Sequence, residues 1–112
     1  MTNHLEYNCI FCRIVAGKEA TTIIYEDDLI TSFYPLTSLY RKHALIIPKA
    51  HLTDLHDMTS KAQLHLLHHI FDNVDRFANI YLSLQDYVVT INSGKEAQQE
   101  VFHLHIHVHS GS

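Results

Sequence analysis

Glycine and proline are scarce in this chain, with only 3 Gly and 2 Pro among 112 residues. No segment is enriched in them, and the sequence contains no repeat and no low-complexity tract. Linkers between domains are usually rich in proline, glycine or polar residues, and a chain of this length suits one domain. The sequence therefore predicts a single domain that spans residues 1–112.

Positive charge is also limited. Lys and Arg total 8 against 12 Asp and Glu, which gives a formal net charge of −4. Proteins that bind duplex nucleic acid carry a basic surface that contacts the phosphates, so this balance argues against such a partner. No apolar run approaches the roughly 18 residues of a membrane span. Residues 1–8 lack the charged-then-apolar pattern of a signal peptide. We expect neither duplex nucleic acid nor a membrane as a partner.

The two cysteines, Cys9 and Cys12, are too few for the disulfide framework of a small secreted protein, so we expect a cytoplasmic location. Their spacing is compatible with a redox pair, with half of a zinc site, or with a plain reduced pair. A redox pair normally lies between a strand and a helix, and nothing before Cys9 has the pattern of a strand. A zinc site needs two further nitrogen or sulfur donors from elsewhere in the chain.

Hydrophobic periodicity predicts an α+β fold. The pattern is that of an antiparallel five-stranded sheet, a short N-terminal helix and one long helix. The expected strands are residues 22–25, 29–33, 44–47, 87–91 and 101–109, and the expected helices are residues 9–16 and 59–84. Glu26-Asp27-Asp28 separates the first two strands and predicts a hairpin turn.

The long helix has an unusually wide apolar stripe. Residues at steps of three and four predict one buried face. They are Leu67, Ile70, Phe71, Val74, Phe77, Ala78 and Tyr81, with Leu64, Leu66, Leu82 and Leu84 beside them. A stripe of this width indicates either a helix deep inside its own domain or a helix that is partly covered by a second subunit.

Histidine, in contrast, is abundant, at 11 of 112 residues. Four histidines alternate with apolar residues between Phe102 and His109. Side chains at i and i+2 of a strand share a face, so Leu104, Ile106 and Val108 should pack inward while the imidazoles line the other face. Imidazole is largely neutral at pH 7, and it can either bind a metal ion or attack phosphorus as a nucleophile. The residues alone are compatible with a metal site and with a nucleophilic catalytic site.

Two more histidines, His65 and His69, are four residues apart on the predicted long helix. This spacing is compatible with a metal site. The residue that follows His65 is Leu66, however, and not the glutamate of a zinc-protease helix. We therefore expect both rings to lie on the solvated face of the helix.

The segment His103-Leu104-His105-Ile106-His107-Val108 resembles the motif of the histidine-triad (HIT) superfamily, nearest its Hint-like branch. Cys9-Ile10-Phe11-Cys12-Arg13-Ile14 is similar to the family's opening. Residues 43–51 are similar to its central strand, with the ending Ile-Pro-Lys-x-His. Residues 89–94, followed by Gln99, are similar to the segment that leads into the triad. The order and spacing of these motifs hold over roughly residues 9–109.

This resemblance implies a nucleotidyl hydrolase or transferase that acts at the α-phosphate of a purine nucleotide conjugate, such as a phosphoramidate, an acyl-nucleotide or a dinucleoside polyphosphate. It implies a nucleotidyl-histidine intermediate on His105, hydrogen bonding to the phosphoryl group by His107, and support from His43. The implied substrate contacts are Asn92 and Gln99 for phosphate and sugar, and Phe11, Ile14, Phe33 and Leu36 for the base. The alternatives are a low-turnover module that binds a nucleotide or a protein, and a metal-dependent catalyst with His105 and His107 as ligands.

The resemblance also implies a structural zinc site, because zinc-binding members complete the cysteine pair with two histidines. The matching residues here are His51 and His103, which would join Cys9 and Cys12. No cofactor is implied for catalysis. Family members commonly form a homodimer through the long helix and a central strand, so that one sheet runs through both subunits.

The sequence departs from the family's pattern at three positions. Pro35 stands where an acidic residue usually contacts the ribose hydroxyls, and it has no side-chain acceptor. Glu100 stands where a small hydroxyl residue usually helps to hold phosphate, and its carboxylate would repel a phosphoryl group. His109 replaces an apolar residue, and we expect a partly exposed side chain there.

Overall fold

The computed structural model describes residues 8–112. In chain order, the elements are α1 (Ile10–Val15), β1 (Thr22–Glu26), β2 (Ile30–Tyr34), β3 (His43–Pro48), the 3-10 turn η1 (Leu55–Asp57), α2 (Lys61–Tyr81), β4 (Val88–Thr90), the 3-10 turn η2 (Lys95–Ala97) and β5 (Ile106–His109). The strands form one antiparallel five-stranded sheet in the order β1-β2-β3-β5-β4. The predicted α+β fold is confirmed.

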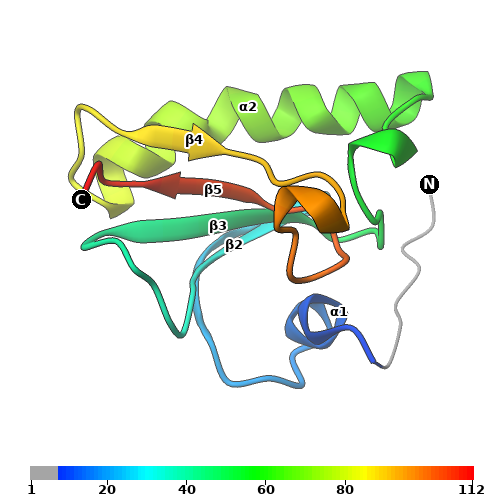
Figure 1. Cartoon of the computed structure of the whole chain (residues 1–112), viewed down its shortest axis with the longest axis horizontal. Helices are drawn as coiled ribbons and strands as arrows, with labels where there is room; N and C mark the ends of the chain where they lie inside the picture. Colours follow the sequence, from blue (N-terminus) through cyan, green and yellow to red (C-terminus); the bar gives the residue numbers. More distant parts are fainter. Residues whose placement is uncertain (1–7) are drawn as a thin grey trace.

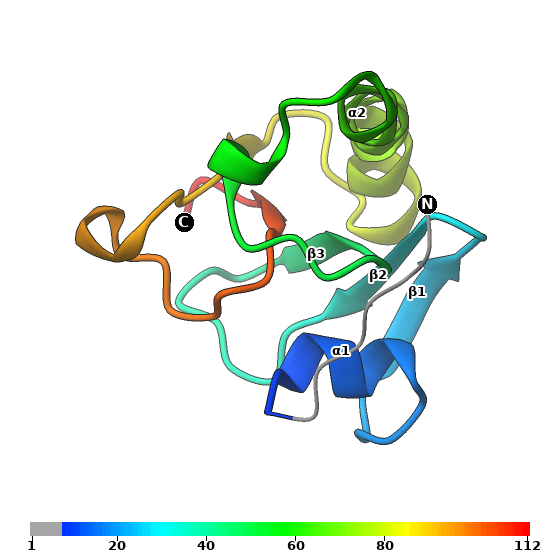
Figure 2. The same cartoon turned by 90° about the vertical axis from the view of Figure 1, so that its right-hand side faces the viewer.

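The sheet separates two apolar clusters. Helix α2 runs across one face and α1 lies against the other (Figure 1; Figure 2). The larger cluster lies beneath α2 and includes the predicted inward set Leu104, Ile106 and Val108, all fully buried. The smaller cluster, beneath α1, contains Phe11 and Phe33. This division places the histidines of the last strand on the α1 side of the sheet.

Helix α2 has defined ends. A capping box starts it, because Ser60 Oγ accepts the Gln63 N–H while Gln63 Oε1 accepts the Ser60 N–H. At the other end the Leu84 N–H donates to the Ala78 carbonyl, and Ser83 has a φ of 56° in the left-handed region. Although α2 has 21 residues, no helix in the described part of the chain is both long and apolar enough to cross a membrane.

The last strand is shorter than predicted, because β5 begins at Ile106 and not near residue 101. Two hydrogen bonds explain the difference. The Leu104 N–H donates to the Leu52 carbonyl (2.6 Å), and His103 Nε2 donates to the carbonyl of Pro48 (2.7 Å) at the end of β3. These bonds replace the regular ladder before Ile106. The inward and outward alternation of the side chains nevertheless continues.

The wide apolar stripe of α2 is not fully buried within the chain. Ile70, Val74 and Phe77 pack against the sheet, but the side chains of Leu64 and Phe71 are 51% and 45% exposed. The interpretation of a helix that is deeply buried in its own domain is therefore wrong for this face.

His69 does not lie on a solvated face as predicted. Its Nε2 donates to Asp27 Oδ2 (2.7 Å), which connects α2 to the β1–β2 turn. Asp27 also accepts the N–H groups of Leu29 and Ile30 and the hydroxyl of Tyr25. Burial by itself would raise the pKa of Asp27, but these hydrogen bonds, with that of His69 the largest, lower it to about 2. The charged carboxylate is the form that stabilises the fold.

We expect Asp27→Asn to lower the free energy of unfolding at pH 7 by about 2 kcal/mol. A carboxyl group whose pKa is lowered on folding stabilises the folded state at every pH above the pKa that it has in the unfolded chain. The difference from the native protein should shrink as pH falls from about 4 towards 2. Urea denaturation at pH 7 and pH 3 measures it. Asp28→Asn, at the exposed neighbour, is the matched control. Equal losses in the two variants would contradict this role for Asp27.

Candidate active site and metal centre

His105 and His107 line a cavity of about 570 Å³ on the α1 side of the sheet. His43 on β3 also lines it, and its partner across the ladder is His109. The predicted base-contacting residues Phe11, Ile14, Phe33 and Leu36 and the predicted phosphate contact Asn92 lie on the walls as well. One cavity is therefore lined both by the three candidate catalytic rings and by the predicted apolar residues.

His105 is oriented by the backbone. Its Nδ1 lies 2.8 Å from the His103 carbonyl, which can only accept, so Nδ1 carries the proton. In the neutral ring, Nε2 then holds the free lone pair. Burial lowers the pKa of His105, although the His103 carbonyl and the Glu100 carboxylate act in the other direction. The ring is therefore neutral and oriented at pH 7, and its Nε2 is unprotonated, which is the form of imidazole that a nucleophilic role requires.

His107 and His43 contact each other directly, with 3.0 Å between His107 Nδ1 and His43 Nε2. Burial, followed by repulsion from neighbouring imidazoles, lowers the pKa of each to about 4. Both rings are neutral at pH 7, so the two facing nitrogens share one proton. His107 Nε2 is left for the cavity.

His109 is buried, at 4% exposure, so the prediction of a partly exposed side chain is wrong. Its ring stacks on Tyr40 with centroids 3.6 Å apart, and its Nδ1 donates to the Ser110 carbonyl (2.6 Å). Sequence reasoning also missed Tyr40 and Ser38, which line the cavity from the loop between β2 and β3. An irregular loop has no periodicity that could have shown which side chains face the site.

Gln99 holds a loop together and is 4% exposed. Its Oε1 accepts the Gly94 N–H, and its Nε2 donates to the carbonyls of Thr53 and Val101. Asn92 donates to the Ala97 carbonyl through Nδ2 (2.9 Å), and it lines the cavity. Substrate contact by either residue remains a prediction.

Four side chains converge beneath α1: Cys9, Cys12, His51 and His103. Their ligand atoms all lie within 4.8 Å of one another. His103 Nδ1 is 3.5 Å from Cys9 Sγ and 3.6 Å from Cys12 Sγ, and His51 Nδ1 is 3.1 Å from Cys12 Sγ. The bond from His103 Nε2 to Pro48 leaves the Nδ1 lone pair directed at the sulfurs. Two thiolates and two imidazoles at such separations fit a tetrahedral zinc ion.

Comparison with known protein families matches residues 16–112 to the HIT domain. The chain belongs to the HIT family. This HIT domain is 33% identical over 109 residues to Protein hit of Bacillus subtilis, a match that covers 94% of this chain and 72% of that protein. It is 32% identical to a HIT family hydrolase from Legionella pneumophila, with a TM-score of 0.85 and 94% of each chain covered.

A third relative is a zinc-bound histidine triad family protein from Mycobacterium smegmatis. It is 35% identical to this HIT domain with a TM-score of 0.78, and the match covers 92% of this chain and 74% of that one. The resemblance drawn from the histidine motif is thus confirmed at the level of the family, and the hydrolase relative supports hydrolase activity of the HIT type.

Proposed function

We propose that this HIT domain releases a nucleoside monophosphate from a purine nucleotide conjugate through a covalent intermediate on His105. The supporting observation is the bond from His105 Nδ1 to the His103 carbonyl, which leaves Nε2 unprotonated at the cavity. Phe11 and Phe33 pack edge to face, with centroids 5.5 Å apart, and offer an apolar wall to the base.

The reaction has two displacements at phosphorus. His105 Nε2 attacks the α-phosphorus, a P–N bond forms, and the leaving group departs with its bonding electron pair and takes up a proton from solvent. Water or another acceptor then attacks the same phosphorus and releases a proton to solvent, and the P–N bond breaks with its electron pair returning to His105 Nε2. His107 hydrogen-bonds the phosphoryl oxygens in both steps, and His43 supports His107. No step requires a cofactor in this proposal.

A panel of adenosine and guanosine phosphoramidates, acyl-nucleotides and dinucleoside polyphosphates tests the activity. We expect release of AMP or GMP from at least one class, measured by chromatography. Tight nucleotide binding without release would instead favour the low-turnover binding module.

Glu100 is the observation that favours this second candidate, because its exposed carboxylate lines the cavity near His105. Exposed charges at a protein surface interact by at most about 1 kcal/mol. We expect Glu100→Ser to raise kcat/KM about fivefold, with a smaller gain at high salt. Initial rates measure the effect, and Glu96→Ser on η2 is the matched charge control. A lower kcat/KM in Glu100→Ser would contradict repulsion by this carboxylate.

We further propose that Cys9, Cys12, His51 and His103 bind a structural zinc ion. The zinc-bound Mycobacterium relative and the four converging donors support this assignment. The ion would connect the start of α1 to the segment just before β5, and it would keep His103 a ligand and not an acid–base group. The cytoplasmic location remains a prediction that rests on the two cysteines.

We also propose a homodimer with a continuous sheet. Strand β4 lies at the sheet edge, and Val88 and Val89 are 41% and 37% exposed. The exposed Leu64 and Phe71 of α2 add apolar surface, which a second copy would cover. We expect Phe71→Lys to convert the dimer to a monomer in light scattering after size exclusion. A native protein that is monomeric at all concentrations would contradict the proposal.

A further inference from the structure

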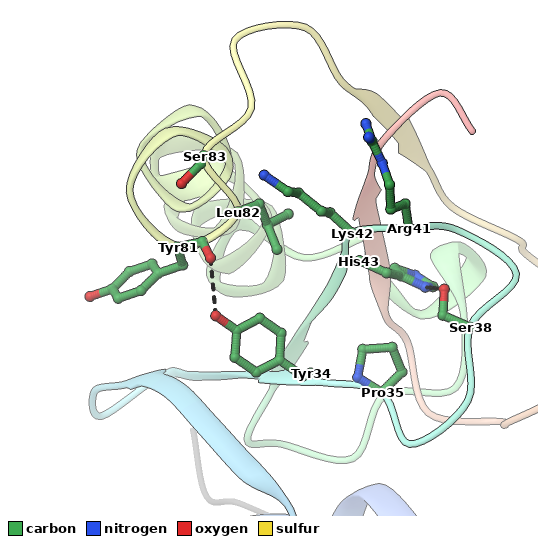
Figure 3. A pocket seen from close by; sticks show the side chains of 9 residues that line it. All are labelled: Tyr34, Pro35, Ser38, Arg41, Lys42, His43, Tyr81, Leu82 and Ser83. Carbon is green, nitrogen blue, oxygen red and sulfur yellow. Dashed lines mark hydrogen bonds between the residues drawn. The ribbon is translucent and has the colours of Figure 1, made fainter.

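A serine hydroxyl completes a chain of hydrogen bonds behind the candidate catalytic rings. Ser38, in the loop between β2 and β3, lies 2.7 Å from His43 Nδ1 through its Oγ (Figure 3). The same Oγ accepts the N–H of Tyr40 at 3.0 Å. His43 Nε2 in turn faces His107 Nδ1 at 3.0 Å. The hydroxyl is thus two hydrogen bonds away from the ring that would contact the phosphoryl group.

Two proton arrangements are possible for these neutral rings. In the first, Ser38 donates to His43 Nδ1, His43 Nε2–H donates to His107 Nδ1, and His107 presents Nε2–H to the cavity. In the second, His107 Nδ1–H donates to His43 Nε2, His43 Nδ1–H donates to Ser38, and His107 presents a bare Nε2. Only the first arrangement lets His107 donate a hydrogen bond to a phosphoryl oxygen.

The surroundings of Ser38 favour the first arrangement. The Oγ already accepts one hydrogen bond from Tyr40, and donation to His43 uses its hydrogen within the chain. In the second arrangement the hydroxyl of Ser38 would have to donate its hydrogen bond to water.

We propose that Ser38 is a positioning residue that fixes the tautomers of His43 and His107, so that His107 presents an N–H to the phosphoryl group. This inference rests on the proposed function. Ser38 touches no reacting atom in it and acts only through His43. A purely structural role, in which Ser38 serves only the turn at Tyr40, would require no particular tautomer of His107.

Ring nitrogen NMR of the free protein tests the proposal without substrate. Long-range proton–nitrogen spectra should show His107 protonated at Nε2 in the native protein, and a mixture of tautomers in Ser38→Ala. Ser38→Thr, which keeps the hydroxyl, should restore the native pattern. Leu39→Ala, at a side chain 96% exposed in the same loop, should leave the ring tautomers unchanged. Native tautomers in Ser38→Ala would overturn the proposal.

Steady-state rates with an adenosine phosphoramidate give the second readout. We expect kcat to fall about fivefold in Ser38→Ala with KM within about twofold, because the lost hydrogen bond acts on the ring that stabilises the transition state. Ser38→Thr should recover most of kcat, and an equal loss in both variants would overturn the proposal. If the native protein releases no nucleotide from any conjugate, the proposed function fails, while the NMR comparison still decides the role of Ser38.

Discussion

His105→Ala should lower the rate of nucleotide release on the order of a thousandfold or more, because it removes the only nitrogen that forms the covalent intermediate in the proposed mechanism. The structure explains the size of this effect. The ring is held by one backbone carbonyl, is neutral at pH 7, and lies at the cavity wall. Single-turnover assays with an adenosine phosphoramidate would measure the rate.

The fold should tolerate this substitution, because His105 lines a cavity and none of its ring nitrogens holds two elements together. Circular dichroism should show unchanged secondary structure. His65→Ala is the matched control, since His65 is exposed on α2, and it should keep the native rate. Full activity in His105→Ala would end the assignment of the nucleophile.

Removal of the proposed zinc ion should lower the melting temperature by more than about 10 °C, because about 3 kcal/mol of stabilisation corresponds to such a shift in a domain of this size. The four donors belong to segments that are far apart in the sequence, so the ion would connect these segments. Without the ion, two thiols and two imidazoles would remain packed together in a largely buried site. Differential scanning calorimetry before and after chelation measures the change.

Cys12→Ser separates metal loss from other effects of the chelator. The variant should melt at a lower temperature than the native protein, and the chelator should then change it no further. Folded apo protein should keep its catalytic rate below its melting temperature, since His105 and His107 are not among the four donors. A chelator that stopped catalysis without lowering the melting temperature would point instead to a metal held by His105 and His107.

The alternation of histidine with apolar residues was enough to predict the burial of Leu104, Ile106 and Val108. Strand periodicity is local, so it survives even where the ladder itself stops. The start of β5 could not be predicted, because it depends on which group the Pro48 carbonyl accepts from. That partner, His103, is 55 residues away in the sequence.

The contacts of His69 and Ser38 could not be predicted either, for two different reasons. Asp27 and His69 are 42 residues apart, and only the packing of α2 on the hairpin brings them together. Ser38 lies in an irregular loop, where no repeat shows which way a hydroxyl points. The width of the α2 stripe was visible in the sequence, but the structure was needed to show that Phe71 stays exposed.

Capture of the covalent intermediate tests the central claim most directly. Native protein is mixed with an adenosine phosphoramidate, quenched within the first turnover in base, which preserves the P–N bond, and digested for mass spectrometry. The account predicts an added adenylyl group on His105 that disappears as AMP is released. Adenylyl on a different residue, or rapid AMP release with no modified peptide at any time point, would contradict it.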